Sequence, residues 1–215
     1  GPMPTQPLGW FKKPIRSVDD LKGLRFRTVG LAAEMFAELG MRVNRLPATE
    51  IVTAIDRGQL DAAEFNNATS DRGLGFPEVA KYCMLQSFHQ PCEQFEILVN
   101  RTRFARLPAE LQAAFAATAQ ACSAEMSWKT IDRYSKDYEA MREGGVIFLR
   151  TPESILEAQL RAWARIIERH SAQNPMFARV ATSMQSFARR AGRWQYDTAV
   201  DHRLAWHDSA AKQNR

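Results

Sequence analysis

The sequence predicts an α/β fold built on parallel strands. Between residues 22 and 65, short apolar runs alternate with segments of helical periodicity, and glycines mark the breaks between them. The three apolar runs are Leu24–Val29, Met41–Leu46 and Leu60–Phe65. A β-α-β-α-β order of this kind joins neighbouring strands by right-handed crossovers, which places the strands parallel in one sheet.

Two helices are expected between these strands. Apolar residues recur at helical spacing from Ala32 to Leu39, and Gly40 follows where a C-terminal glycine is favoured. Thr49 is expected to cap a second helix, Glu50–Asp56, which ends before Gly58. Before the first strand, residues 3–13 are Pro-rich and should be extended, and Ser17–Gly23 should form a short helical turn.

After residue 65 the patterns of apolar residues are weaker or extend over longer segments. Asn66–Gly75 is polar and turn-prone, so it is expected to be a loop, which either binds a ligand or only turns the chain. Two strand-like runs follow, and then helices with apolar stripes, the last of which Gly192 is expected to kink. In chain order these elements are strands Tyr82–His89 and Gln94–Asn100, helix Pro108–Arg142, strand Val146–Leu149, helices Pro152–His170 and Phe177–Trp206, and a polar tail Ala210–Arg215.

Composition excludes several classes of protein. The 215 residues carry a net charge of +5, but the basic residues are scattered, so nucleic-acid binding is not expected. No catalytic motif is present, so we do not expect an enzyme. The three cysteines, Cys83, Cys92 and Cys122, have no metal-ligand or disulfide spacing and are expected to be buried, inert thiols.

Two ionisable residues stand at the ends of predicted strands. Arg27 lies near the end of the first strand and Glu64 near the end of the third, and ligands of parallel sheets bind at the carboxyl ends of strands. Arg27 could hold a carboxylate through two hydrogen bonds, with Glu64 orienting the guanidinium or binding a cation. The pair could equally be a structural salt bridge at the sheet edge.

At these residues the chain resembles the solute-binding proteins of tripartite ATP-independent periplasmic (TRAP) transporters, in the branch that binds small carboxylic acids. The matching segments run in order along nearly the whole chain. They are GWFKKPI (9–15), DLKGLRFR (20–27), LPATEIVTAIDRGQLDAAEF (46–65), LGFPEVAKY (74–82), FEILVN (95–100), LPAELQAA (107–114) and GGVIFLR (144–150). Where the family usually has glycine, proline and tryptophan, this chain has Leu8, Val29 and Phe65.

The resemblance implies a periplasmic-binding-protein-like (type II) α/β second lobe, with a long bridging helix and C-terminal helices, and with the first lobe truncated. In this interpretation residues 1–13 are an extended lead-in that begins with a protease scar, 14–75 the ligand-binding lobe, 76–106 inter-lobe strands, 107–143 the bridging helix, and 144–215 a returning strand and C-terminal helices. The inter-lobe strands would lack their usual partners, which predicts a rearranged lobe, a strand exchanged between subunits or a second polypeptide.

The resemblance also implies site residues. Arg27 would pair with the ligand carboxylate, and Glu64 and Phe65 would belong to the ligand and metal-ion site. The other candidate ligand-binding residues are Gln6, Trp10, Asn66 and His89, although His89 could also be purely structural. No cofactor is expected beyond sodium or another cation.

Two classes of function remain open at this point. The first is a TRAP solute-binding protein, or a truncated form of one, that binds a small carboxylic acid such as a 2-oxo acid through a salt bridge to arginine. The second is a truncated, oligomerising interaction module in which ligand binding is vestigial or absent. The partners of the chain would be a small carboxylate, TRAP membrane subunits if the chain is a full binding protein, and a second copy of the chain. The second copy is expected because Trp194–Trp206 should form a homodimer interface, unless this segment packs on its own lobe. No signal peptide is visible, so the chain is expected in the periplasm if cut from a precursor and in the cytoplasm if Met3 is the start.

Overall fold

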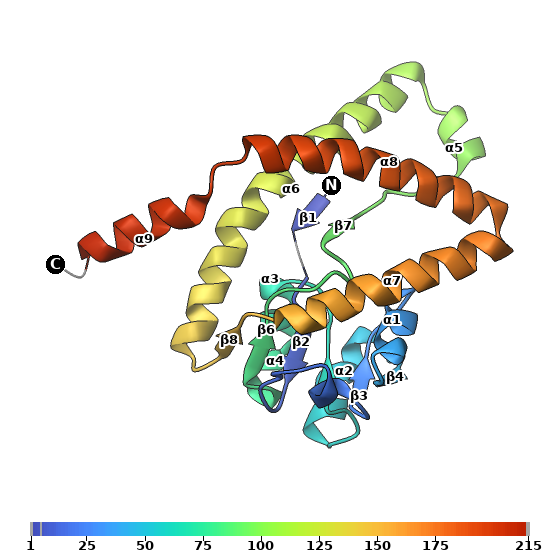
Figure 1. Cartoon of the computed structure of the whole chain (residues 1–215). Coiled ribbons are helices and arrows are strands. Elements are labelled where there is room, and N and C mark those ends of the chain that lie inside the picture. The colour runs from blue at the N-terminus through green and yellow to red at the C-terminus, as the bar shows by residue number, and fades with distance from the viewer. Residues whose placement is uncertain (1, 5, 214–215) are drawn as a thin grey trace. The chain divides into compact units, whose positions relative to one another are not determined.

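The computed structural model describes residues 2–4 and 6–213 (Figure 1). The chain forms two compact units, Gly1–Ala164 and Arg165–Arg215. Gly1 of the supposed scar and the last two residues of the predicted tail lie outside the described residues. Within the described part, no helix is both long and apolar enough to cross a membrane.

The first unit is built around one mixed sheet, and the predicted parallel core of that sheet is confirmed. Its order is β4-β3-β5-β2-β6-β8, with β3 parallel to both β4 and β5, and β6 parallel to β8. The strands are β2 (Gly9–Phe11), β3 (Arg25–Arg27), β4 (Arg42–Asn44), β5 (Ala62–Ala63), β6 (Tyr82–Met84) and β8 (Ile147–Leu149). They are shorter than the apolar runs that predicted them.

Strand β2 is part of the predicted lead-in, but it lies in the middle of the sheet. It pairs antiparallel with β5 on one side and with β6 on the other. Gly9 makes this possible, because a Cβ atom there would lie 2.8 Å from the carbonyl oxygen of Ala63 and φ is 149°. The pairing partners are more than 50 residues away, so local sequence could not reveal them.

Helices surround this sheet, and two sequence-based expectations about them are wrong. Thr49 does not cap the second helix, which begins at Ala48, two residues earlier than predicted, after Pro47 and with no side-chain cap. Asn66–Gly75 is not a loop, because α3 occupies most of it and Asn67 caps that helix by accepting a hydrogen bond from the Ser70 amide at 3.0 Å. The elements are the 3₁₀ turn η1 (Asp19–Leu21) and helices α1 (Ala32–Glu38), α2 (Ala48–Asp56), α3 (Ala68–Leu74) and α4 (Phe76–Val79).

The core of the first unit lies between the sheet and these helices. Phe26 at the centre of β3 packs against Phe11 and Phe36, with ring centroids 6.0 and 4.7 Å away. A second cluster includes Trp10, Ile51, Ile55, Leu60, Phe76, Cys83 and Met141. Burial of these side chains is the main force that holds the strands together.

The two strands predicted between residues 82 and 100 are wrong in extent. β6 ends at Met84, since the backbone amide and carbonyl of Phe88 bond to side chains of a helix instead of a neighbouring strand. Of the second run, Gln94–Asn100, only Gln94 lies in a strand, at the end of β7 (Cys92–Gln94), which pairs with β1 (Pro2–Pro4) in a separate two-stranded sheet. Residues 95–100 have no strand, and Leu98 is 88% exposed.

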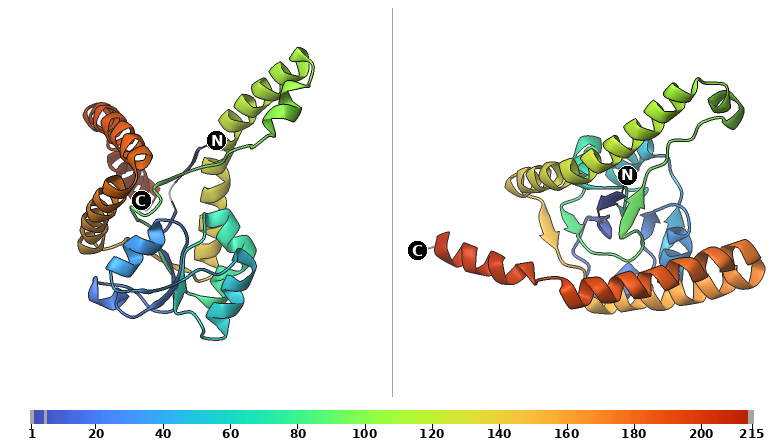
Figure 2. Two further views of the ribbon diagram at one scale, coloured as in Figure 1. Left: turned by 90° about the vertical axis from the view of Figure 1, so that its right-hand side faces the viewer. Right: turned by 90° about the horizontal axis from the view of Figure 1, so that it is seen from above.

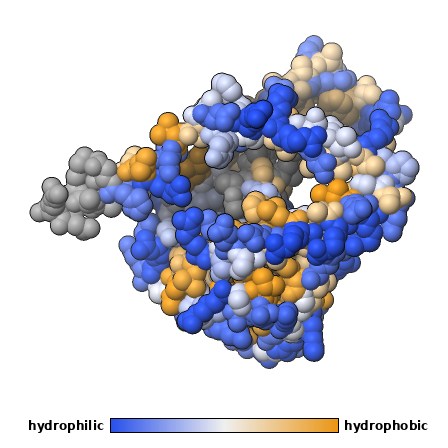
Figure 3. All heavy atoms as spheres, viewed as in Figure 1, coloured by the Kyte–Doolittle hydropathy of each residue, from blue (hydrophilic) through white to orange (hydrophobic). Residues whose placement is uncertain are grey.

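The predicted long helix is confirmed as α6 (Ala109–Glu143), which follows α5 (Arg101–Ala105). Its C-terminal end joins the core through Met141, whereas its N-terminal half projects beyond the sheet (Figure 2). Several members of its predicted core stripe, including Leu111 and Phe115, are exposed. In the face drawn in Figure 3, hydrophobic residues form separate patches among hydrophilic ones.

The second unit is helical. It contains the end of α7 (Glu153–Gln173), then α8 (Pro175–Thr198) and α9 (His202–Gln213). The single helix predicted for Phe177–Trp206 is wrong, because Asp201 accepts a hydrogen bond from the Arg203 amide and starts a new helix. α8 runs through Gly192 without a break, and His170 and Phe177 join α7 to α8 with ring centroids 5.3 Å apart.

Candidate functional site

The sheet brings Arg27 and Glu64 together at its carboxyl edge. Arg27 is the last residue of β3, and Glu64 follows β5, so parallel pairing places them side by side. The Arg27 Nη1 atom donates to the Glu64 carboxylate at 3.2 Å and to the Glu64 carbonyl at 3.1 Å, while Nε donates to the Leu46 carbonyl at 3.0 Å. The side chains are 7% and 3% exposed, so the pair is buried.

Within the described part of the chain, one nitrogen of this guanidinium, Nη2 of Arg27, donates no hydrogen bond to the protein. The guanidinium carbon also lies 5.7 Å from the centroid of the Phe65 ring. An unused donor beside an aromatic face suits a planar carboxylate ligand.

Gln6 and His89 complete a polar cluster around Glu64. The Gln6 amide nitrogen donates to the Phe65 carbonyl at 2.8 Å, so its oxygen is left to accept from His89 Nε2, also at 2.8 Å. His89 Nε2 therefore carries a proton and lies 3.8 Å from the Glu64 carboxylate. His89 Nδ1 then accepts from the Ser87 hydroxyl at 2.7 Å.

Sequence reasoning missed the residues that support His89. Gln159 on α7 is fully buried, donates to the Ser87 hydroxyl at 2.9 Å and accepts from the Phe88 amide at 2.7 Å. Trp163, one turn further along, donates to the Phe88 carbonyl at 2.8 Å. The sequence contained a signal for this role, because Gln159 is a polar residue within the buried apolar stripe of α7 that includes Ile155, Ala162 and Ile166.

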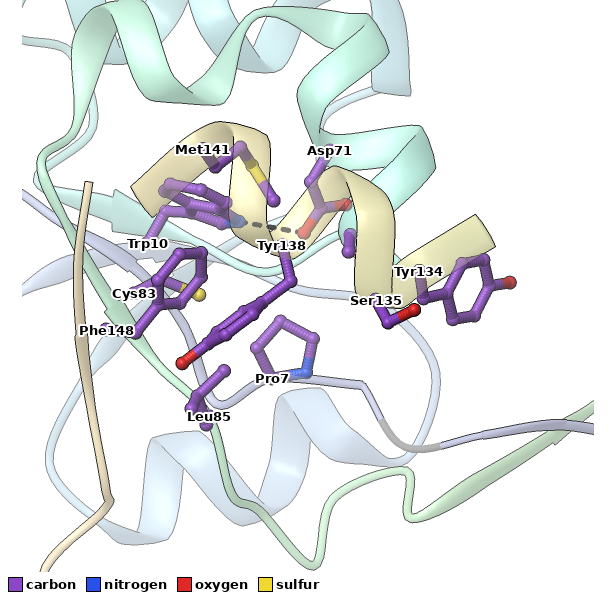
Figure 4. Close-up of a pocket in the computed structure, with 11 residues that line it drawn as sticks. Pro7, Trp10, Asp71, Cys83, Leu85, Tyr134, Ser135, Tyr138, Met141 and Phe148 are labelled. Carbon is purple, nitrogen blue, oxygen red and sulfur yellow. Dashed lines mark hydrogen bonds between the residues drawn. The ribbon is translucent and has the colours of Figure 1, made fainter. Parts of the chain in front are cut away.

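The structure does not place Trp10 and Asn66 in this cluster. The Trp10 indole donates to one carboxylate oxygen of Asp71 at 2.8 Å, and the Asn66 backbone amide donates to the other at 3.1 Å. Figure 4 shows the contact between Trp10 and Asp71 beside a cavity of about 260 Å³, where the rings of Tyr138 and Phe148 lie close to each other. Arg27 does not line this cavity.

Burial raises the pKa of Asp71 to about 7, although the Trp10 and Asn66 hydrogen bonds act in the opposite direction. The negative charge of Glu64 adds to the increase. Asp71 therefore gains or loses its proton near neutral pH.

Asn66 also lines a wider groove of about 500 Å³ between the start of α3 and the middle of α6. The groove is lined by Asn67, Phe95, Met126, Arg133 and Tyr134 among others. Cys122 on α6 lies there as well and is exposed, as is Cys92, so only Cys83 fulfils the expectation of a buried thiol.

The oxygen atoms near Glu64 could hold a cation. The Glu64 carboxylate, the Phe65 carbonyl and the Gln6 amide oxygen lie in one cluster, and hard oxygen donors suit sodium or calcium. In the described residues, no group of three or more His, Cys, Asp or Glu side chains is arranged to bind a metal. A cation here would depend on carbonyl and amide oxygens, which fits a hard ion and not zinc.

Comparison with known proteins identifies relatives of this chain. Residues 6–174 match the model of the family described as DctP, bacterial extracellular solute-binding protein, family 7. The chain is 31% identical over 190 residues to a monocarboxylate 2-oxoacid-binding periplasmic protein of Nostoc sp., covering 86% of this chain and 51% of that protein.

Two crystal structures are similar over nearly the whole chain. One is a TRAP periplasmic solute binding protein from Colwellia psychrerythraea with bound calcium and pyruvate (TM-score 0.87, 28% identity, 97% of this chain and 63% of that one). The other is from Bordetella bronchiseptica, a mixed occupancy dimer with copurified calcium and picolinate (TM-score 0.88, 25% identity, 98% and 62%). The chain thus spans about half to three fifths of the length of these relatives.

Proposed function

Because the chain belongs to the DctP family of bacterial extracellular solute-binding proteins, we propose that it binds a small monocarboxylate such as a 2-oxo acid. The observation that carries this proposal is the unused Nη2 donor of Arg27 beside Glu64 at the sheet edge. The names of two relatives support it, since one binds monocarboxylate 2-oxoacids and another holds pyruvate.

Arg27 is the group that would fix the carboxylate. Its Nε and Nη1 atoms are held by two carbonyl oxygens and by Glu64, so the fork is oriented before the ligand arrives. Arg27 is 6% exposed, and its Nη2 atom is not among the fully buried polar atoms that lack a partner, so a ligand would reach the guanidinium through this small accessible part. The Phe65 ring, which lies 5.7 Å from the guanidinium carbon, would pack against the ligand.

Glu64, the Phe65 carbonyl and the Gln6 amide oxygen would hold a cation next to the ligand. A cation there offsets the negative charges of Glu64 and of the bound carboxylate, which would otherwise repel each other. His89 would serve by keeping Gln6 in place through its 2.8 Å contact. Trp10 and Asn66 would act indirectly, through the shared contact with Asp71.

As a partner, we propose the membrane subunits of a TRAP transporter, with the periplasm as the location, in keeping with the periplasmic relatives. The family is one of solute-binding proteins, and the absence of enzymatic activity in this chain stays a prediction.

Calorimetric titration with pyruvate, with and without calcium, tests the proposal. Wild type should bind, and Arg27→Lys should weaken binding about tenfold, because lysine keeps the charge but has no Nη2 donor held in place by the other guanidinium nitrogens. Arg25→Lys is the matched control, since Arg25 lies two residues away on β3 and pairs with Asp61 at an exposed position.

Glu64→Gln tests the cation site in the same titrations. Without the carboxylate, calcium should no longer strengthen pyruvate binding. Failure of wild type to bind pyruvate in calcium, or equal affinities in wild type and Arg27→Lys, would contradict the proposed role of Arg27.

A further inference from the structure

Asp71 joins the centre of the sheet to the turn that carries the proposed site. Its Oδ2 atom accepts from the indole of Trp10 on β2, and its Oδ1 atom accepts from the backbone amide of Asn66. Asn66 directly follows Phe65, whose carbonyl oxygen bonds to Gln6. One fully buried carboxyl group therefore holds both β2 and the Glu64–Asn66 turn.

The charge of Asp71 determines how firmly its carboxyl group holds β2 and the Glu64–Asn66 turn. Both contacts have an N–H donor facing a carboxylate oxygen, and an ionised carboxylate offers an acceptor to each. Protonation turns one oxygen into a hydroxyl, which is a weaker acceptor, and removes the charge that strengthens both bonds. Both contacts lose this charge, so the contact with the Asn66 amide weakens whichever oxygen takes up the proton, and the Asn66 turn becomes less firmly held.

Other ionisable groups face Asp71 from each neighbouring element. Glu64 lies on the turn after β5 and repels the ionised form. Cys83 on β6 lines the same cavity, and burial keeps the pKa of its thiol well above the usual value, so it stays neutral. Tyr134 and Tyr138 on α6 line the cavity too. Asp137 on α6 is bound to Arg72 and Thr69 on α3.

We propose that Asp71 is a positioning residue for the ligand site and that its negative charge is required for full affinity. This inference rests on the proposed function, because the turn that Asp71 holds carries Glu64 and Phe65. Affinity for pyruvate in calcium should fall about three- to tenfold between about pH 8 and about pH 6, the range across which the carboxyl group takes up its proton. By reciprocity, binding should release protons from Asp71.

Calorimetry on the full chain with pyruvate and calcium tests the pH dependence. Asp71→Asn should bind with nearly the same affinity at both pH values, since it cannot titrate. Trp10→Phe removes a donor that stabilises the ionised form, so the midpoint should move to higher pH. Asp56→Asn, at an exposed position of α2, is the control and should behave as wild type. A pH dependence that survives in Asp71→Asn overturns the inference.

A second measurement needs no ligand. The sequence contains one Phe–Asn pair, Phe65–Asn66, so labelling phenylalanine carbonyls with ¹³C and asparagine amides with ¹⁵N gives a single selective resonance for Asn66. Its shift and that of the Trp10 indole, which is identified by its loss in Trp10→Phe, should titrate with one shared midpoint near neutral pH. Separate midpoints, or no titration, overturn the inference even if pyruvate binds. If pyruvate does not bind, the proposed function fails, and this titration still decides whether Asp71 holds the turn.

Discussion

Arg27 and Glu64 form a buried ion pair whose energetics differ from those of a surface salt bridge. Desolvating both charges is costly, and the hydrogen bonds from Arg27 to two backbone carbonyls offset part of that cost. Removing one partner leaves an unpaired charge in a buried position. Removing one of the two residues should therefore lower the stability of the fold more than replacing both with apolar residues does.

This leads to a double-mutant prediction. Arg27→Leu should lower the free energy of unfolding by about 3–5 kcal/mol, and adding Glu64→Leu should restore part of that loss. Urea denaturation followed by circular dichroism measures both values. If the loss in free energy of unfolding in the double mutant equals the sum of the losses in the two single mutants, the two side chains do not interact as described.

Asp71 gives a second residue-scale prediction, on stability and pH. Its pKa is raised from 3.8 to about 7 in the folded chain, so the folded state holds a proton that the unfolded state releases. Stability should fall as pH rises from about 4 to about 7, on the order of 1 kcal/mol per pH unit from this group. Comparing urea midpoints of wild type and Asp71→Asn across this range isolates the contribution. Parallel pH profiles for the two proteins would contradict it.

Among the elements, α7 supports the site through Gln159. Gln159→Leu keeps the approximate size, but it removes one donor to the Ser87 hydroxyl and leaves the Phe88 amide without its acceptor. We expect a loss of about 1–3 kcal/mol in the free energy of unfolding, because buried polar groups would be left unsatisfied. Gln120→Leu on the exposed surface of α6 is the control and should change stability little. Thermal unfolding of both variants distinguishes the two positions.

The parallel part of the sheet could be predicted from the sequence, and the reason is local. The order of apolar runs, helical stripes and glycines between residues 22 and 65 specifies strands and crossovers without long-range information. It also placed Arg27 and Glu64 at the same edge, which the structure confirms. Whether they bind a ligand is a separate question that the proposed titrations address.

Other elements could not be predicted because their contacts are distant or ambiguous. The position of β2 depends on partners in β5 and β6, and the Gln6–His89 contact joins residues 83 positions apart. Asn67 favours turns but also caps helices, and in α3 the second tendency prevails. Asp71 lies in the segment Asn66–Gly75, whose polar sequence predicts a loop, and nothing local indicates that this residue is fully buried.

At the scale of the whole molecule, the second unit presents an apolar stripe along α8. Met176, Val180, Met184, Phe187 and Trp194 follow helical spacing and are 49–69% exposed. Stripes of this size are usually covered by another polypeptide. The Bordetella relative is a dimer. The interface predicted from the sequence at Trp194–Trp206 stays a prediction, and we propose that a second copy of this chain also covers this stripe of α8.

Disrupting this stripe should therefore change the oligomeric state. Met184→Glu with Phe187→Glu should convert the dimer into a monomer, because two charges would be buried without partners. Gln185→Glu, on the opposite side of α8, is the control and should leave the dimer intact. Size-exclusion chromatography with light scattering gives the masses. A wild-type monomer would contradict the dimer, and a dimer that persists in the double variant would place its interface elsewhere.

A crystal structure of the chain grown with pyruvate and calcium tests the central claim most directly. The proposed function predicts the pyruvate carboxylate within hydrogen-bond distance of Arg27 Nη2, and calcium on the Glu64 carboxylate and the Phe65 carbonyl. Pyruvate bound elsewhere, or calcium on a different set of oxygens while the Arg27–Glu64 contact remains closed, would contradict it.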